Sequence, residues 1–555
     1  MAAHASTTAP GGWLRVLAGA ADALLLPIIV AGALARIIAL PGYVPDSGDE
    51  WGNTMAPFRV LYEGGDPNLF LHPSLYYDVT AAAYAAVLAV ARAGGFVDRT
   101  MSMTDVFILD QRYFVFAARG VSVLGALLAM WALYGIGTAL WNRRAGLFAA
   151  ALLAVYPLHA VYSDAVRVDS LFLAAFIYAF SRIVRMLTNP AVRTSAIAGL
   201  FTGIAVGANY NGGLLVGWLI AAHLLANAGA ASPADTARRL ARALAFTALG
   251  FIVTSPFILL NSGTFIVNFA FISGLSTSEH PGMEGRGVAF YAEELMRLNP
   301  LLCGAIAAGV LAIMLLGTRR ERFVLSLPVG YFLVFSLLRT KFDRFILPAM
   351  ALFFLVASGL PMVLARCAAA QRAIAGLTYA LASALLFLCV AAMAPRAIPV
   401  PRHQMLARPD APLFDWIEHA VPPRSNILVE SGIVQLTDTL KEPGRFAAEL
   451  RASMVRVRPH LDQQFIGATY IGGAANYEPG ILAAKQIDYA IISPRNVRYI
   501  ESQCASFPDV CAFYGELRAR SGRVRDAGRI RTGDRLSDPT RGALMRLTGR
   551  RATAR

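Results

Sequence analysis

The sequence predicts an α-helical polytopic membrane protein followed by a small C-terminal α/β domain on the extracytoplasmic side. Of its 555 residues, 56% are hydrophobic and only 15% are charged, and the mean hydropathy is +0.53, whereas roughly a quarter of the residues of a soluble protein are charged. Apolar runs recur from Leu14 to Met393, each near the ~20 residues that cross a bilayer. Short loops rich in arginine separate many of these runs, which is the pattern of membrane topology.

The basic loops predict an orientation with about eleven membrane spans. Clusters such as Arg143–Arg144, Arg238–Arg242 and Arg319–Arg322 then lie in the cytoplasm. The first apolar run is too long for the ~7–15-residue core of a cleavable signal, so we interpret it as a retained span. The expected spans are 18–40, 113–140, 145–162, 170–187, 195–209, 212–229, 243–262, 298–317, 323–338, 345–365 and 373–394.

One further apolar run, 75–91, does not fit this alternation, because a crossing there would move Arg143–Arg144 outside. We interpret it as an interfacial or re-entrant helix that begins near Pro73, within a large outer loop 41–112. Outer loops 162–169 and 263–297 follow. The outer loops mix acids with bases, whereas the inner ones are almost purely basic, and this asymmetry predicts chemistry at the outer face.

The composition changes after the last span. We expect a transmembrane domain 1–394, a proline-rich linker 395–410 and a C-terminal domain 411–555, with a helix at 411–420 and strands at 426–430 and 487–493. The arginine-rich tail from Ser521 is expected to be partly mobile. Cys504 and Cys511 would form a disulfide if this domain is extracytoplasmic, and the sequence leaves that pairing open.

The formal net charge of +15 does not indicate a nucleic-acid partner, because the arginines lie between apolar runs instead of along one face or groove. A basic exterior favours membrane lipids that are anionic, or lipid-linked phosphates. No C-x-x-C pair occurs, which disfavours a zinc ribbon or a thioredoxin-like site.

Three carboxylates follow the first span in the stretch P-D-S-G-D-E: Asp46, Asp49 and Glu50. Carboxylates are costly near hydrocarbon, so such a cluster predicts a chemical task. A carboxylate here could act as the base for a hydroxyl or amine nucleophile, or hold a metal. The alternatives are a solvated loop cluster or a cap for a helix that starts near Trp51. Asp46 is the weakest of the three, since it could be only a turn residue before Gly48.

Further candidates lie in or beside the other predicted outer segments. His72 precedes Pro73 and could be a simple capping residue. Asp164, Arg167 and Asp169 follow the third span; Asp169 could pair with Arg167 or cap the next helix, and Arg167 could bind a phosphate. Lys341 and Arg344 are bases on the outer side, against the positive-inside rule, and an anionic phosphate would explain them. Two residues with open alternatives complete the set: Arg36, which could snorkel or meet the same anion, and Tyr210, in a predicted outer turn.

The order of these motifs resembles the glycosyltransferase C superfold over residues 40–365, and in particular glycosyltransferase family 39, the protein O-mannosyltransferases and the lipid A aminoarabinose transferases. Asp49-Glu50 matches their acid pair, and His72-Pro73-Ser74-Leu75 is similar to His-Pro-Pro-Leu. Ser163 and Asp169 match Ser-Arg-x-x-x-x-Asp, although Asp164 replaces the arginine and Arg167 could take over its role. The segment from Lys341 through Arg344 to Pro348 resembles a basic residue followed by Arg-Tyr-Leu-x-Pro, whereas Asn209 stands where many relatives have Lys.

The resemblance implies a transferase of the glycosyltransferase C type in a bacterial inner membrane, with its site on the periplasmic side. It would move a sugar from a polyprenyl-phosphate carrier to a lipid, glycan or protein acceptor. Lys341, Arg344 and Arg167 would stabilise the leaving phosphate, and Asp49 would deprotonate the acceptor, with inversion at the anomeric carbon. Glu50 and Asp169 would orient the acceptor or Asp49, or share a divalent metal (Mg²⁺ or Mn²⁺), a choice the sequence leaves open. The loop 263–297 would form a lid.

Two rival functions use a similar topology. A transporter or flippase of a lipid-linked sugar would also place charges at a membrane cavity, although inverted repeats typical of transporters are not evident and the charges cluster at one face. A surface polysaccharide polymerase or ligase is the second rival.

Overall fold

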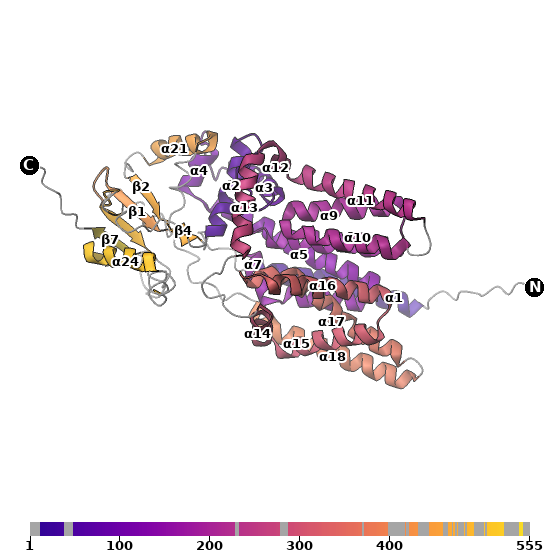
Figure 1. The fold of residues 1–555 in the computed structure, drawn as a ribbon. Helices are drawn as coiled ribbons and strands as arrows, with labels where there is room; N and C mark the ends of the chain where they lie inside the picture. Colours follow the sequence, from indigo (N-terminus) through magenta and orange to yellow (C-terminus); the bar gives the residue numbers. More distant parts are fainter. Residues whose placement is uncertain are drawn as a thin grey trace, which may run out of the picture. The chain divides into compact units, whose positions relative to one another are not determined.

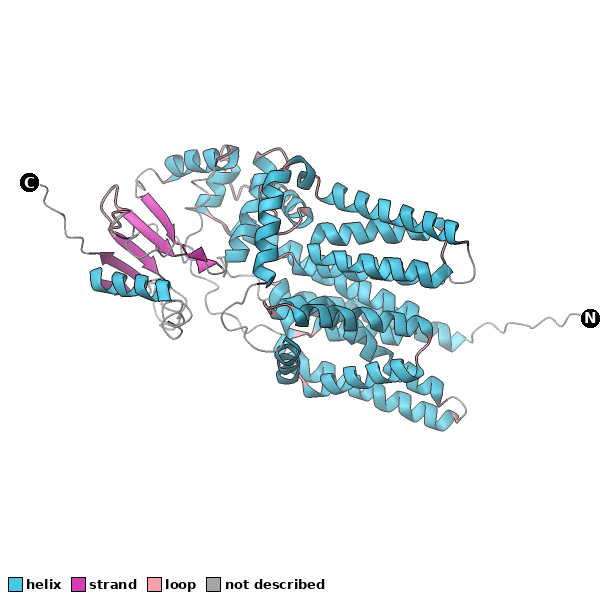
Figure 2. Ribbon diagram, in the orientation of Figure 1, coloured by secondary structure: helices cyan, strands magenta, loops and turns pink. Residues whose placement is uncertain are grey.

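The structure is a computed structural model, and helices dominate it (Figures 1 and 2). It describes residues 12–37, 48–227, 232–277, 287–368, 371–397, 417, 421–430, 443–458, 464–468, 470–471, 474–475, 482, 485–492, 504, 508–526 and 543–547. Contacts divide the chain into two compact units that do not follow chain order. We call residues 1–40, 69–79 and 119–402 the helical unit, and residues 41–68, 80–118 and 403–555 the mixed unit.

The helical unit consists of helices joined by short turns. Its elements are α1 (Gly12–Ile37), α6 (Arg143–Ala154), α7 (Pro157–Ser163), α8 (Asp169–Thr188), α9 (Val192–Ala208), η1 (Tyr210–Gly213), α10 (Leu214–Asn227), α11 (Pro233–Thr254), α12 (Phe257–Leu260), α13 (Ser262–Thr277), α14 (Gly287–Leu298), α15 (Pro300–Leu316), α16 (Arg319–Leu337), η2 (Asp343–Ile346), α17 (Leu347–Cys367) and α18 (Arg372–Ala397). Two more helices, α3 (Leu75–Ala93) and α5 (Arg112–Leu140), contribute residues to both units.

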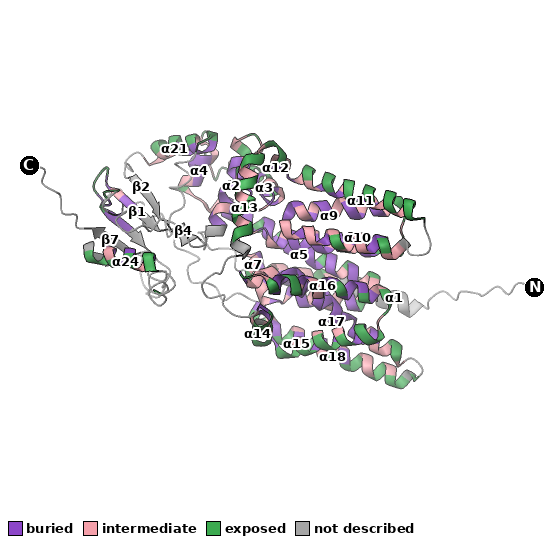
Figure 3. Ribbon diagram, viewed as in Figure 1, coloured by how far each residue is buried: buried purple, intermediate pink, exposed green. Residues whose placement is uncertain are grey.

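A helix corresponds to every predicted span, and α3 corresponds to the predicted interfacial helix. Within the described residues, four helical segments are long and apolar enough to cross a membrane, or five if the bent pair α6–α7 counts as one: Arg112–Leu140, Asp169–Thr188, Asp343–Cys367 and Ala373–Ala397. The segment Asp343–Cys367 is 94% buried and forms the centre of the unit, whereas α18 exposes Leu377, Leu381 and Phe387 (Figure 3). An apolar helix that exposes such side chains is expected to face lipid.

The span predicted at 145–162 is broken: α6 and α7 meet at an angle of 64°. Pro157 is the first residue of α7, and Tyr156 before it has an extended backbone (φ −73°, ψ 111°). Proline lacks the N–H of a continuous helix and disfavours helical geometry in the residue before it. The break therefore has a local cause and leaves carbonyl groups at the end of α6 that need other donors.

The predicted outer loop 263–297 is largely helical, because α13 and α14 occupy its two ends. The apolar sequence of α13 exposes Ile266 and Val267. Four of the polar residues expected in this loop, Glu279, His280, Glu284 and Arg286, lie outside the described residues.

The mixed unit contains α2 (Gly48–Tyr62), α4 (Met103–Leu109), α21 (Arg445–Val457) and α24 (Pro508–Arg520), together with a five-stranded sheet of order β2-β1-β5-β7-β6. The strands are β1 (Asn426–Glu430), β2 (Gln464–Ala468), β5 (Tyr489–Ile492), β6 (Ser521–Asp526) and β7 (Ala543–Leu547), and a separate pair joins β3 (Tyr470–Ile471) to β4 (Ala474–Ala475). In this sheet β1 pairs in parallel with β2 and β5, whereas β7 is antiparallel to β5 and β6.

The two predicted strands correspond to β1 and β5, and Cys504 and Cys511 form a disulfide. Within the arginine-rich tail, β6 and β7 pair along the sheet edge, and its expected partial mobility stays a prediction. The predicted linker was expected to begin at 395, but α18 continues to Ala397. The rest of the linker and the helix at 411–420 lie outside the described residues, apart from Ile417.

Candidate functional site

The predicted second outer loop, 162–169, and the Lys341–Arg344 turn contact each other inside the helical unit. The hydroxyl of Tyr162, at the end of α7, donates a hydrogen bond of 2.6 Å to Asp343 Oδ1. The Arg167 guanidinium lies 5.2 Å from the centre of the Tyr162 ring, a cation–π distance. Arg344 also interacts electrostatically with Tyr162. Two segments that the sequence separates by about 180 positions therefore place cations around one tyrosine.

The Lys341–Arg344 turn is itself held from several sides. Tyr291 of α14 donates a hydrogen bond of 3.1 Å to the Phe342 carbonyl. The Arg344 guanidinium lies 4.7 Å from the centre of the Phe342 ring, and the Arg344 N–H donates to Asp343 Oδ1 at 2.8 Å. Lys341 is only 5% exposed. A buried cation is costly unless anionic or polar groups surround it, and the Asp343 carboxylate lies in the same turn.

Arg36 does not snorkel to the surface, one of the two alternatives that its sequence position left open; contact with an anion stays a prediction. Arg36 is fully buried and binds the α6–α7 break: Nη1 donates to the Ala154 carbonyl at 3.1 Å and Nε donates to Ser163 Oγ at 2.7 Å. Its Nη2 lies 2.9 Å from His159 Nδ1. Arg36 also interacts electrostatically with Asp164, the C-cap residue of α7. The cation thus satisfies groups freed by the break and fixes the start of the second outer loop.

The His72 segment joins the same group of contacts. Tyr210 at the start of η1 donates a hydrogen bond of 2.9 Å to the Phe70 carbonyl, and Asn268 of α13 accepts the Phe70 N–H at 2.9 Å. Ser122 of α5 lies 3.2 Å from the Tyr76 hydroxyl and donates to the Arg167 carbonyl at 3.0 Å. The predicted turn at Tyr210 is therefore present, and it packs against the loop that carries His72.

Asp169 is the first residue of α8, and its carboxylate lies near enough to Tyr331 of α16 to interact with it electrostatically. Val168, and not Asp169, occupies the N-cap position of α8, and no side chain caps this helix; pairing of Asp169 with Arg167 stays a prediction. Contacts with Tyr162 thus bring Arg167 and Arg344 together, while Asp164 and Asp169 lie at the end of α7 and the start of α8 and Lys341 lies in the turn before α17. The predicted residues of the helical unit are His72, Asp164, Arg167, Asp169, Tyr210, Lys341 and Arg344.

The acidic half of the predicted site belongs to the mixed unit. Asp49 and Glu50 lie in the first turn of α2, and Glu50 is only 1% exposed. The Thr54 hydroxyl donates to the Glu50 carbonyl at 2.7 Å, and Tyr84 of α3 donates to the Thr54 carbonyl at 3.2 Å. The backbone of this turn is thus tied to a second helix. Asp46 and the side chain of Asp49 lie outside the described residues.

Metal binding remains a prediction. In the part of the chain that the structure describes, no group of three or more His, Cys, Asp or Glu side chains is placed to hold a metal ion. A cavity of about 470 Å³ lies at the end of α8 opposite Asp169, lined by Arg182, Arg185, Asn189, Ala191, Arg193, Thr194 and Ile197. It belongs to the basic segment predicted to be cytoplasmic, and it is separate from the contacts described above.

Sequence reasoning missed several residues that hold these segments together, namely Ser122, Tyr162, Asn268 and Tyr291. Each is a hydroxyl or amide side chain within an apolar or aromatic stretch, where a side chain that only fills the core would look the same. Their partners are distant in sequence, so no local pattern could have identified them.

Comparisons with known proteins identify one family model and several similar folds. A family model described as dolichyl-phosphate-mannose-protein mannosyltransferase matches residues 113–260. The fold is similar to that of ArnT from Cupriavidus metallidurans in the apo state, at 13% identity and a TM-score of 0.52, over 95% of this chain and 98% of that one. ArnT bound to undecaprenyl phosphate matches at 12% identity and a TM-score of 0.50, over 97% and 98%.

An oligosaccharyltransferase of Archaeoglobus fulgidus, in the apo form, is similar at 10% identity and a TM-score of 0.52, over 86% of this chain and 70% of that one. No curated protein sequence matches the chain. The resemblance that the motifs predicted is therefore confirmed: residues 113–260 match a mannosyltransferase family, and the fold is similar to that of membrane glycosyltransferases of the glycosyltransferase C type.

Proposed function

We propose that this chain is a membrane glycosyltransferase that moves a sugar from a polyprenyl-phosphate carrier to an extracytoplasmic lipid, glycan or protein acceptor. The observation that carries the proposal is the cluster of Arg167 and Arg344 around Tyr162 and Asp343, with the buried Lys341 in the same turn as Arg344. It lies in a unit of apolar helices, where a lipid-linked phosphate could reach it. The similarity to a fold solved with undecaprenyl phosphate supports the same ligand class.

In the proposed reaction, the acceptor oxygen or nitrogen attacks the anomeric carbon as the bond from that carbon to the phosphate oxygen breaks. Asp49 removes the acceptor proton, and the polyprenyl phosphate leaves with the bonding electrons. Arg167, Lys341 and Arg344 stabilise the charge that develops on the phosphate. Glu50 and Asp169 orient the acceptor or Asp49. Attack from the side opposite the leaving phosphate inverts the anomeric configuration.

The proposal includes about eleven membrane spans and a site on the extracytoplasmic, periplasmic side of a bacterial inner membrane. Two observations support this orientation: arginines gather at the ends of α8 and α11 that are remote from the site, and Cys504 and Cys511 are paired. Disulfides persist in oxidising compartments outside the cytoplasm.

The test uses the full-length protein in lipid vesicles with radiolabelled polyprenyl-phosphate sugars. The unsubstituted chain should transfer label from the carrier to an acceptor or to water. Asp49→Asn should slow transfer by about 10²–10⁴-fold, the usual contribution of a general base. Asp98→Asn is the matched control: it removes an exposed carboxylate of the same predicted outer loop, whose partner is Thr100, and should transfer label normally.

The same assay separates the rival functions. A flippase would move the labelled carrier across the bilayer and leave the sugar attached; the break between α6 and α7 is the feature that favours this rival, because broken helices are common in transporters. A polysaccharide polymerase would build the label into products of increasing length. Equal transfer by Asp49→Asn and the unsubstituted chain would exclude Asp49 as the base.

A further inference from the structure

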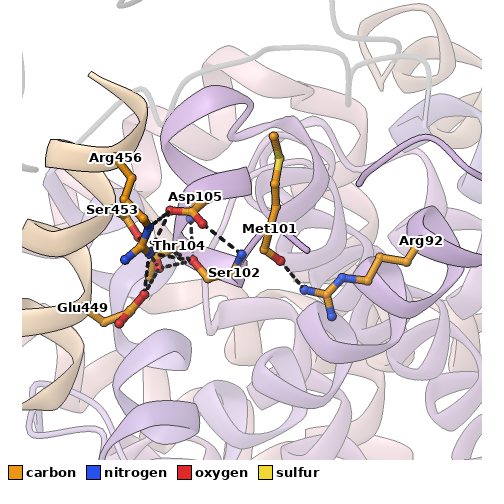
Figure 4. Close-up of polar contacts among 8 residues, drawn as sticks. All are labelled: Arg92, Met101, Ser102, Thr104, Asp105, Glu449, Ser453 and Arg456. Carbon is orange, nitrogen blue, oxygen red and sulfur yellow. Dashed lines mark hydrogen bonds and ion pairs between the residues drawn. The ribbon is translucent and has the colours of Figure 1, made fainter. Parts of the chain in front are cut away.

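Helix α21, from the C-terminal part of the chain, packs against the first outer loop inside the mixed unit. Phe446, Leu450 and Ser453 are buried on one face of α21, at the three- to four-residue spacing of a helix face. This face meets α4 and the end of α2, which come from a segment more than 300 residues earlier. The contact has three parts, and Figure 4 shows the polar one.

The first part is aromatic. The Phe446 ring stacks on the Phe58 ring of α2, with the centroids 5.4 Å apart and the planes only 6° from parallel. Phe58 is fully buried. Its ring also lies 4.8–5.0 Å from Tyr84 of α3, Phe107 of α4 and Phe114 of α5. Aromatic pairs at such distances contribute beyond the area they bury, so α21 completes a cluster that joins five helices.

The second part is at the start of α21. Glu63, directly after α2, accepts the Phe446 N–H at 2.8 Å through Oε1. The first N–H groups of a helix lack partners within it, and an anion there is favourable. Gly444 before the helix has φ +123°, and a Cβ there would lie 2.6 Å from Glu63 Oε1. The outer loop therefore supplies the cap of α21, and glycine leaves room for it.

The third part is polar. Arg456 Nη2 donates to Asp105 Oδ1 of α4 at 2.9 Å and to Glu449 Oε1 of α21 at 2.7 Å. Beside this pair, Thr104 and Ser453 hydroxyls lie 2.7 Å apart and are fully buried. Burial alone would raise the pKa of Asp105, but hydrogen bonds from Ser102, Ser453 and Arg456 outweigh it and lower the pKa. Asp105 thus remains an anion for Arg456 at neutral pH.

We propose that α21 is a positioning clamp for α2. It holds α2, and with it Asp49 and Glu50, in a fixed orientation. This positioning is a function of the C-terminal part of the chain. The inference rests on the proposed function. Pro57 lies inside α2 and removes one of the hydrogen bonds that would keep the helix rigid. Phe58, one residue later, is held by Phe446. From Phe58 to Glu50 the helix spans roughly 12 Å at 1.5 Å per residue, so a shift at the clamp reaches the acidic turn.

The test combines a spectroscopic distance with kinetics in the full-length chain. Spin labels at Leu61→Cys on α2 and Val455→Cys on α21, both exposed positions, report whether α21 holds α2; Cys303, Cys367 and Cys389 are replaced by Ser. Arg456→Gln and Phe446→Ala remove the polar and aromatic contacts, and Arg456→Lys retains the charge. Arg445→Gln, an exposed arginine on the same helix, is the matched control.

We expect a narrow distance distribution in the parent, in Arg445→Gln and in Arg456→Lys, and a broad one in Arg456→Gln and Phe446→Ala. In the variants with a broad distance distribution, kcat should fall by about 10- to 100-fold, because small misplacements of catalytic groups have effects of this size. The KM for the donor should change by less than about twofold. Arg456→Lys should keep most of the activity, which a simple folding defect would not explain.

Two results would overturn the clamp: an unchanged distribution in both contact variants, or a broad distribution with kcat intact. Absence of transfer by the parent chain would count against the proposed function instead. The distance measurement would then still decide whether α21 holds α2.

Discussion

At the scale of single residues, charged side chains in apolar surroundings are the most informative feature of this chain, and the sequence alone could not explain all of them. The sequence left open whether Arg36 reaches the surface or an anion. Arg36 is buried against Ala154 and Ser163, and the α6–α7 break frees the Ala154 carbonyl that it binds. That partner set exists only in the folded chain. The sequence could flag Arg36 as unusual but could not assign its role.

Glu321 is a second buried charge, and it gives a prediction about pH. Burial alone would raise its pKa, but hydrogen bonds from Arg366, the Thr318 N–H and Trp141 outweigh burial and lower the pKa to about 2. The ionised form is therefore bound more tightly in the folded state than in the unfolded state, where the pKa is about 4.3. The stabilisation is complete above about pH 4.3 and should be lost as the pH falls from there towards 2.

Thermal unfolding in detergent between pH 7 and 3 would measure this loss. Glu321→Gln should lower stability at pH 7 by about 1.5–3 kcal/mol, the range for hydrogen bonds to charged groups. It should also reduce the loss of stability that acidification causes. Glu293→Gln is the control, because its pair with Arg297 is exposed and contributes little. An equal loss of stability on acidification in the parent and in Glu321→Gln would contradict this role of Glu321.

At the scale of elements, the apolar runs predicted the positions of the helices well, since length and hydropathy are local properties of the sequence. What they could not predict was how the helices pack. Helices α9 and α11 approach closely where Gly199 and Gly203 face α11: an added Cβ would lie 2.1 Å from the Ala243 carbonyl oxygen at Gly199 and 2.0 Å from the Thr247 carbonyl oxygen at Gly203. Small residues four apart allow such contacts between membrane helices.

Gly203→Ala should therefore destabilise the protein by about 1–3 kcal/mol, the cost of overpacking, despite the higher helix propensity of alanine. Gly217→Ala in the adjacent helix α10 is a matched control, because a Cβ there meets no atom within 4 Å. It should be neutral or stabilising by up to ~1 kcal/mol. The difference in unfolding temperature between the two variants measures the effect of the close contact between α9 and α11. Equal unfolding temperatures would argue against this contact.

At the scale of the whole molecule, contacts group the chain in an order that the sequence did not predict. Residues 41–68 and 80–118 belong with the C-terminal part, and the segment 69–79 between them belongs with the helices. The order of the motifs predicted the segments that form the basic cluster, and the Tyr162–Asp343 contact joins two of these segments. The domain grouping depends on contacts such as Phe58–Phe446, which link aromatic residues that resemble ordinary core positions in the sequence.

The proposed orientation gives the last prediction, because charge asymmetry assigns the predicted outer loops and the basic inner loops to opposite sides of the membrane. Asp98 and Arg193 are both exposed; the first is predicted to lie outside and the second in the cytoplasm. With Cys303, Cys367 and Cys389 replaced by Ser, Asp98→Cys should react with an impermeant maleimide in intact spheroplasts. Arg193→Cys should react only after the membrane is permeabilised. The reverse labelling pattern would place the cationic cluster on the cytoplasmic side. The donor would then have to come from the inner leaflet of the membrane.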